Sequence, residues 1–80
     1  MLVRFNAWLS EITNCAEADL PHEKTAGDLL RSLRETYGEK LRQTDIIILI
    51  NGHHIGRMGG LAALLNPDDR VDVFPVADGG

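Results

Sequence analysis

The fold is indicated most clearly by the stretch Thr25-Ala26-Gly27-Asp28-Leu29-Leu30-Arg31-Ser32-Leu33-Arg34-Glu35-Thr36-Tyr37-Gly38, which has the pattern of one amphipathic helix. Thr25 can cap the free amides of the first turn, and Asp28 follows it three residues later. The apolar residues recur at helical spacing and form one stripe suited to lie on a sheet: Ala26, Leu29, Leu30, Leu33 and Tyr37. We expect Arg31, Arg34 and Glu35 to point outward and Gly38 to end the helix.

Two strands are predicted before this helix. Residues 2–9 alternate, which places one set of side chains (Val3, Phe5, Ala7, Leu9) on one face and the other set (Leu2, Arg4, Asn6, Trp8) on the opposite face. Turn-forming residues at 10–14 separate this segment from a second alternating run at 16–20, which Pro21 closes. The pattern predicts a hairpin of two strands.

The segment after the helix predicts three more strands. Residues 46–50 are a continuous run of Ile and Leu, as expected of a central strand buried on both faces, and Asn51-Gly52 suits a tight turn into a short return strand at His53-His54-Ile55. The glycines between residues 56 and 60 indicate a mobile loop, residues 61–65 a short apolar turn or helix, and residues 66–69 a turn. Residues 71–76 alternate again as the last strand.

This order of elements predicts an α+β fold, the ubiquitin-like β-grasp: a mixed sheet of four to five strands with one main helix across one face. By analogy with that fold, we expect the first and last strands to pair in parallel at the centre of the sheet. Residues 1–76 would form the domain. Residues 77–80 would form a flexible tail, because Ala, Asp and two Gly provide no apolar anchor.

Composition restricts the classes of function. The chain has 80 residues, enough for one small domain, and a net charge of −4, which makes nucleic acid an unlikely partner and a basic protein surface a better one. Its single cysteine, Cys15, forms no internal disulfide, and the N-terminal segment has no long apolar run, so we expect a cytoplasmic protein without a membrane span. His53 and His54 are adjacent on a strand and face opposite sides, so we expect no metal site.

The end of the chain suggests a chemistry. Gly79 and Gly80 would leave a main-chain carboxylate with no side chain near it, on the thinnest thread that a polypeptide can form. A carboxylate is a poor electrophile until it is activated, for example as an acyl-adenylate. The Gly80 carboxylate is therefore the candidate reactive group, with Gly79 beside it in the thread.

Four stretches carry a resemblance to a known family. The chain resembles the MoaD/ThiS family of sulfur carriers, and most of all the small subunit of molybdopterin synthase. The matching stretches are Phe5-Asn6-Ala7-Trp8-Leu9-Ser10-Glu11, Thr25-Ala26-Gly27-Asp28-Leu29-Leu30, Ile50-Asn51-Gly52, and Asp69-Arg70-Val71 leading to Phe74-Pro75 and Gly79-Gly80. They cover essentially the whole chain, and the spacing from Phe74 to the end is that of the family.

The resemblance implies a protein cosubstrate and not an enzyme. An E1-like enzyme using ATP and Mg²⁺ would adenylate the Gly80 carboxylate, and a sulfur donor protein would convert it to a thiocarboxylate. The tail would then enter the large subunit of molybdopterin synthase. Partners would supply the catalytic groups, so this chain would bind no cofactor of its own.

The partner-binding residues are predicted around the tail and its root. They are Phe74, Pro75, Val76, Ala77, Asp78 and Trp8. A four-residue thread buries too little area for a standard interface of about 1,600 Å², so the folded surface beside it must contribute. If Val71 and Val73 face the helix, Phe74 lies on the open face of the sheet with Trp8 and Asn6 of the first strand. A register shifted by one residue would instead bury Phe74 and expose Val73.

Two other functions remain open. A carrier of the thiamine pathway, or a ubiquitin-like protein modifier, would use the same tail chemistry and differ in where the sulfur or acyl group goes. A β-grasp interaction module with an inert Gly-Gly end belongs to a different class of function.

Overall fold

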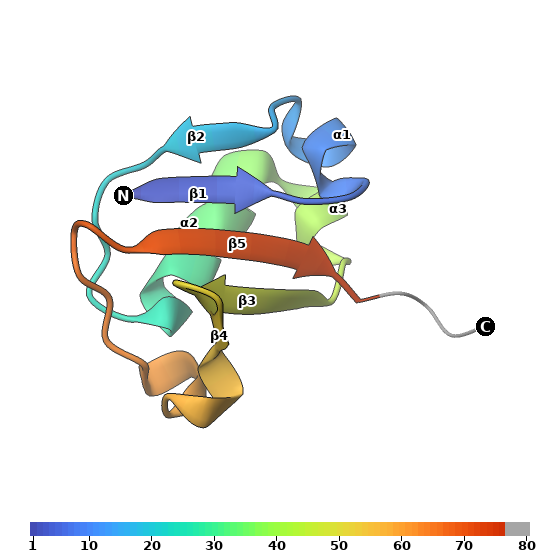
Figure 1. Cartoon of the computed structure of the whole chain (residues 1–80). Helices are drawn as coiled ribbons and strands as arrows, with labels where there is room; N and C mark the ends of the chain where they lie inside the picture. Colours follow the sequence, from blue (N-terminus) through green and yellow to red (C-terminus); the bar gives the residue numbers. More distant parts are fainter. Residues whose placement is uncertain (77–80) are drawn as a thin grey trace.

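A computed structural model of the chain describes residues 1–76, and the predicted tail at 77–80 lies outside the described residues (Figure 1). The strands are β1 (Leu2–Phe5), β2 (Glu17–Asp19), β3 (Ile46–Ile50), β4 (His53–His54) and β5 (Arg70–Pro75). The helices are α1 (Leu9–Thr13), α2 (Ala26–Tyr37) and α3 (Glu39–Arg42), with 3₁₀ turns η1 (Ile55–Arg57) and η2 (Gly60–Ala62).

The five strands form one mixed sheet in the order β2-β1-β5-β3-β4. β1 pairs in parallel with β5, with Val3 beside Val71 and Phe5 beside Val73. β2 is antiparallel to β1, and β3 is antiparallel to both β5 and β4. The predicted mixed sheet and the central parallel pair are therefore confirmed.

The core lies between the sheet and α2. On β1 and β5 the buried residues alternate with exposed or half-buried ones, so Val3, Val71 and Val73 are wholly buried on the face toward the helix. From α2, Leu29 and Leu33 pack against them and are 1% exposed. Burial of an aliphatic side chain of this size stabilises the fold by about 1.5 to 3 kcal/mol relative to exposure. The apolar stripe therefore holds α2 on the sheet.

The predicted ends of α2 are confirmed. The Thr25 hydroxyl accepts a hydrogen bond from the amide of Asp28 at 3.1 Å, which satisfies one of the free donors of the first turn. Gly38 follows the last helical residue with φ of 83°, a conformation that a residue with a Cβ adopts at a cost. Its amide donates to the Arg34 carbonyl at 3.1 Å, which closes the helix.

The prediction of a first strand over residues 2–9 was wrong at its second half. The strand ends at Phe5, and Ala7 takes a left-handed φ of 52°, which breaks the two-residue alternation. Leu9 and Thr13 belong to α1, where they lie one helical turn apart and are buried. Because Leu9 fits both a strand and a helix, the apolar pattern alone did not place the boundary. The helix replaces the turn predicted at residues 10–14.

The rest of the C-terminal half agrees with the prediction only in part. The glycine segment predicted as a loop contains η1 and the start of η2. The short apolar turn or helix predicted at residues 61–65 is present as η2, and Ala63 and Leu65 after it are buried in the core. The short helix α3 was not predicted, although Leu41 within it is buried. Strand β3 is buried on one face only, since Ile47 and Leu49 are half-buried on the face away from α2.

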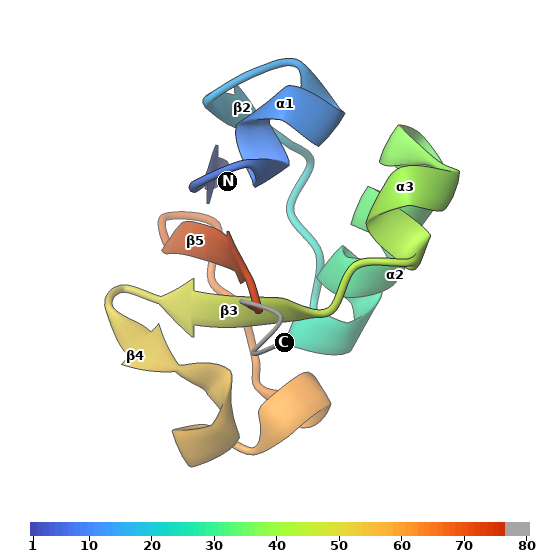
Figure 2. The same ribbon diagram turned by 90° about the vertical axis from the view of Figure 1, so that its right-hand side faces the viewer.

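Helices α2 and α3 lie together on one side of the sheet. Viewed along the sheet from the end at which β5 finishes, α2 and α3 stand against one face (Figure 2). Within residues 1–76 no helix is long and apolar enough to cross a membrane.

Candidate functional site

The site is built where β5 leaves the sheet. Because β1 and β5 are parallel, the turn after β1 and the segment after β5 emerge at the same end of the sheet (Figure 1). The amide of Val76 donates to the Asp45 carbonyl at 2.9 Å, one residue before β3 begins. This bond anchors the chain at Val76, the last described residue.

Phe74 lies on the face of the sheet that α2 does not cover. Its neighbours Val73 and Val71 are wholly buried against the helix, and alternation turns Phe74 to the opposite face, where it is half-buried. Directly opposite it on β3 is Ile47. Of the two registers left open for β5, the structure has the one in which Val71 and Val73 face the helix and Phe74 lies on the open face. The alternative, with Phe74 in the core and Val73 exposed, is not found.

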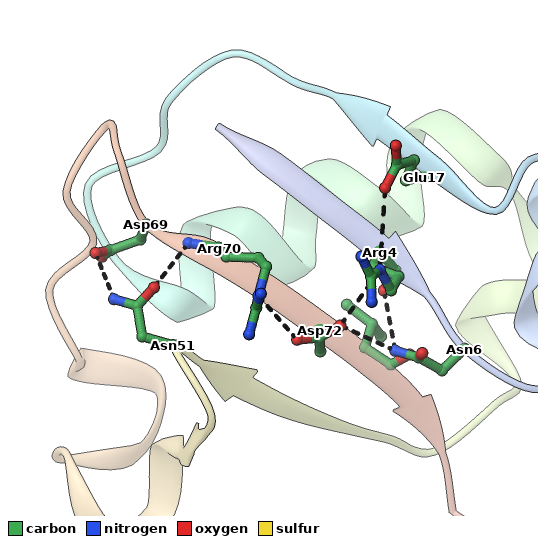
Figure 3. A network of polar contacts seen from close by, with 8 residues as sticks. Arg4, Asn6, Glu17, Asn51, Asp69, Arg70 and Asp72 are labelled. Atoms are coloured by element: carbon green, nitrogen blue, oxygen red, sulfur yellow. Dashed lines mark hydrogen bonds and ion pairs between the residues drawn. The ribbon is translucent and has the colours of Figure 1, made fainter.

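A polar network lies beside this apolar pair (Figure 3). Asp72 of β5 has a side chain only 13% exposed; its carboxylate lies 4.0 Å from Arg4 Nε and 3.7 Å from Arg70 Nε. Arg4 also reaches Glu17 of β2 at 3.9 Å. Exposed ion pairs of this kind add about 0 to 1 kcal/mol each, so the network orients side chains on the open face more than it stabilises the fold.

Asn6 joins the end of β1 to β5. Its main-chain amide donates to the Val73 carbonyl at 2.9 Å, and its side-chain amide donates to the same carbonyl at 3.2 Å and to the Asp72 carboxylate at 3.3 Å. Residues 66 positions apart in the sequence are thereby held together just before Phe74. The alternation of side chains could predict that Arg4 and Asp72 lie on one face of the sheet. The sequence alone could not predict their contacts with Asn6.

The predicted place of Trp8 on the open face of the first strand was wrong. Trp8 follows the left-handed turn at Ala7 and stands at the start of α1, where 45% of its surface is exposed. It nevertheless belongs to the segment that emerges beside the root of the tail. Of the predicted partner-binding residues, the structure describes Phe74, Pro75, Val76 and Trp8; Ala77, Asp78, Gly79 and Gly80 lie outside the described residues.

The other end of β5 is held by Asn51 (Figure 3). The Asn51 side chain accepts a hydrogen bond from the Arg70 amide at 3.0 Å and donates to the Asp69 carboxylate at 2.9 Å. The second carboxylate oxygen of Asp69, a residue only 9% exposed, accepts from the Asn66 amide at 2.7 Å. These bonds fix the residue at which β5 begins, and therefore which residues lie at its other end, beside the root of the tail.

One titratable group beneath the sheet is perturbed. Burial raises the pKa of Tyr37 above its ordinary value of 10.0, and the neighbouring Cys15 adds to this shift by charge and by a hydrogen bond. The Tyr37 ring packs edge-on against Phe5, with ring centroids 5.3 Å apart. Tyr37 stays protonated and neutral at neutral pH, in keeping with a packing role.

The geometry defines a class of protein: a ubiquitin-like β-grasp domain whose central strand leads to a Gly-Gly end. A profile described as the ThiS family matches residues 3–80. The chain belongs to the ThiS family, whose members are small ubiquitin-like sulfur carriers.

Solved structures agree with this assignment. The solution structure of small archaeal modifier protein 1 from Methanosarcina acetivorans is similar, with 31% identity over 99% of this chain and 94% of that chain and a TM-score of 0.76. A Pyrococcus furiosus protein assigned as subunit 1 of a molybdopterin converting factor shares 22% identity over 92% and 93% of the two chains, with a TM-score of 0.75.

A structure of the BexX/CysO complex from Amycolatopsis orientalis also has the fold, with 16% identity, a TM-score of 0.79 and coverage of 99% and 98%. No curated protein sequence is a significant match. The last two solved structures share less than a quarter of their residues with this chain and establish its fold alone.

Proposed function

We propose that this chain is a sulfur carrier of molybdopterin biosynthesis, acting as a protein cosubstrate. The family match, which includes Gly79 and Gly80, is the observation that supports the carrier chemistry. The proline that follows Phe74 favours the molybdopterin branch of the resemblance. The anchored root at Val76 supports the carrier chemistry, because a fixed starting point lets a short thread reach into a partner's active site.

In the proposed reaction, a Gly80 carboxylate oxygen attacks the α-phosphorus of ATP on an E1-like enzyme, and pyrophosphate leaves. A persulfide on a sulfur donor then attacks the acyl carbon and AMP leaves. A thiol cleaves the resulting acyl disulfide, which releases a thiocarboxylate on Gly80. ATP and Mg²⁺ are held by the activating enzyme, and this chain contributes the carboxylate and the surface that positions it.

The partner surface is proposed around Phe74. Phe74 and Ile47 form a half-buried apolar pair beside the exposed Val76, and the ion pairs of Arg4 and Asp72 border it. An apolar centre with a polar border is the usual composition of a protein interface. The net charge of −4 favours a basic partner surface. The large subunit of molybdopterin synthase would bind the same surface after sulfur transfer.

The test measures ATP–pyrophosphate exchange by an E1-like enzyme with this chain as the acyl acceptor. We expect exchange with the intact chain and none after deletion of Gly80, with an unchanged circular dichroism spectrum. The intact mass of protein isolated from its native host should show replacement of one oxygen by sulfur. Exchange that continued at the normal rate without Gly80 would contradict the proposal.

A protein modifier is the second candidate, favoured by the 31% identity to a small archaeal modifier protein. In that case a lysine amine of a target attacks the same acyl-adenylate and forms an isopeptide bond. Trypsin cuts after Arg70, so such targets would carry residues 71–80 on a lysine. Detection of that adduct in the native host supports conjugation, whereas a thiocarboxylate without adducts supports sulfur transfer. An inert interaction module would show neither product.

A further inference from the structure

A groove of about 570 Å³ lies on the outer side of α2, away from the sheet. Its floor is Gly27 and Leu30 of α2, and Leu61 of η2 forms one wall. A Cβ on Gly27 would stand 3.1 Å from the Leu61 carbonyl oxygen, so the absence of a side chain there lets η2 pack close against α2. Leu61 remains 56% exposed, which leaves the groove with an apolar wall open to solvent.

Three arginines surround the groove in a chain that is acidic overall: Arg31, Arg34 and Arg42. Arg31 pairs with Asp28 at 3.8 Å and Arg42 with Glu39 at 3.5 Å. Within residues 1–76, Arg34 has no ion pair within 4.0 Å, and its Nε is buried without a hydrogen-bond partner. Among the three arginines, Arg34 is therefore the one whose charge has no partner in the described part of the chain. Because its Nε is buried, a ligand in the groove would reach the guanidinium through the two terminal nitrogens.

This position corrects the prediction that Arg34 points outward into solvent. Arg31 and Glu35 are exposed as expected, but Arg34 is half-buried, one turn after Leu30 on the same side of α2. Arg34 therefore lines the groove together with the apolar side chains of Leu30 and Leu61, although its Nε is buried. Glu35 also lines the groove and repels a negatively charged ligand.

We propose that this groove binds an acidic peptide segment of a partner protein, with a carboxylate on Arg34 and an apolar side chain against Leu30 and Leu61. A groove of this size accommodates a ligand much larger than a single inorganic anion. Guanidinium groups bind carboxylates through charge-assisted hydrogen bonds. The net charge of −4 repels long polyanions such as nucleic acids, so the attraction is local to the three arginines and suits only a short acidic segment.

The groove and the Phe74 surface lie on opposite sides of the sheet. A partner in the groove can therefore stay bound while the end of the chain is in an enzyme. The proposal goes beyond the carrier function and does not depend on it, because its test uses no activating enzyme.

The test is a nuclear magnetic resonance titration of the isotope-labelled full chain. The ligand is an acetylated, amidated peptide of sequence Leu-Glu-Leu-Glu, and the control ligand is Leu-Gln-Leu-Gln. We expect saturable shifts of the Arg34 Nε–H signal and the Leu61 amide with the acidic peptide, and none at Phe74. Equal shifts with the neutral peptide, or no shifts with the acidic one, would overturn the proposal. The same shifts with inorganic phosphate at equal concentration would indicate a simple anion site and also overturn it.

Matched variants test which charges of the groove contribute to peptide binding. Arg34→Gln should weaken binding of the acidic peptide roughly tenfold or more, the loss expected when a hydrogen bond to a charged group is removed. Arg57→Gln, at an exposed arginine of η1 outside the groove, should leave affinity unchanged. Glu35→Gln should tighten binding by removing a repulsive charge.

Leu61→Ser tests the apolar contact at an exposed position and avoids the risk that an α2 variant fails to fold. It should weaken binding of the acidic peptide while the rest of the spectrum is retained. Unchanged affinity in both Arg34→Gln and Leu61→Ser would overturn the proposal.

Discussion

Phe74 of β5 stands directly opposite Ile47 of β3, on the sheet face that α2 leaves uncovered. Val73, the residue before Phe74, is wholly buried on the other face. One residue of register thus separates a core position from a surface position at the root of the tail. The Phe74 side chain is therefore a candidate for binding without being indispensable for folding.

Replacement of Phe74 by Ala should weaken binding of the activating enzyme while the domain stays folded. We expect a loss of about 1 to 2 kcal/mol in the free energy of unfolding, because part of the ring is in water; a fully buried Phe would cost roughly 3 to 5 kcal/mol. Chemical denaturation and isothermal titration calorimetry measure the two effects. Leu33→Ala is the control for the core, with an expected cost of about 2 to 5 kcal/mol. A Phe74 variant as unstable as this control would argue against the interface role.

Trp8 is the only tryptophan of the chain, so a fluorine label on tryptophan gives one signal for the segment after β1. That signal should shift when the activating enzyme binds, since Trp8 emerges at the same end of the sheet as β5. Trp8→Ala should weaken the complex with little loss of stability, because 45% of the side chain is exposed. Met58→Ala is the matched control: Met58 is 40% exposed but belongs to the η1 segment. Equal effects of the two variants would contradict a specific role for Trp8.

Replacement of Asn51 should lower the free energy of unfolding more than replacement of most polar residues. Asn51→Ala removes the bonds to Asp69 and the Arg70 amide and leaves the part-buried Asp69 carboxylate with one partner fewer, for an expected loss of about 1 to 3 kcal/mol. Asn51 also has a left-handed φ of 51°, so Asn51→Gly separates the two contributions by retaining that conformation without the side chain. Denaturation midpoints of the two variants measure the difference. A wild-type midpoint for Asn51→Gly would show that the hydrogen bonds contribute nothing.

The raised pKa of Tyr37 predicts a loss of stability in alkali. The folded state holds the proton more tightly than the unfolded state, so the stabilisation is complete below pH 10.0 and is lost as pH rises from there through the folded pKa. Tyr37→Phe keeps the ring against Phe5 and should flatten this part of the stability profile. Urea denaturation makes the comparison over a pH range from about 2 units below the ordinary pKa to about 1 unit above it.

Tyr37 is the only tyrosine, so ultraviolet titration reports its pKa directly. Removal of the sulfur in Cys15→Ala should lower the midpoint toward the ordinary value without reaching it, because burial is the larger cause. A midpoint at the ordinary value in the wild-type protein would refute the shift.

The sequence predicted best the elements whose local pattern and tertiary burial agree. In α2, the cap at Thr25, the stripe through Leu29 and Leu33 and the stop at Gly38 all specify the same helix. In β5, alternation alone separated Val73 from Phe74. At Leu9 the burial requirement is satisfied by either a strand or a helix, and the choice depends on the left-handed turn at Ala7.

The site was less accessible to sequence reasoning because its polar contacts are long-range. Asn6 and Asp72 meet only because β1 and β5 are neighbours, and nothing within either segment specifies the partner. Arg34 was assigned to the solvent because α2 alone leaves that side open. The groove around Arg34 exists only after η2 and α3 have packed against the helix.

The parallel pairing of β1 with β5 also determines when the sheet can form during synthesis of the chain. Val3 is synthesised among the first residues, yet its central partner Val71 follows only after nearly all the rest of the domain. Contacts so distant in sequence slow folding, since a long loop must be closed before they form. The nascent chain therefore cannot complete its sheet until β5 has been made. A fragment that ends before β5 lacks the middle strand of the sheet, so β1 and β3 would each keep an unpaired edge on the side where β5 pairs with them.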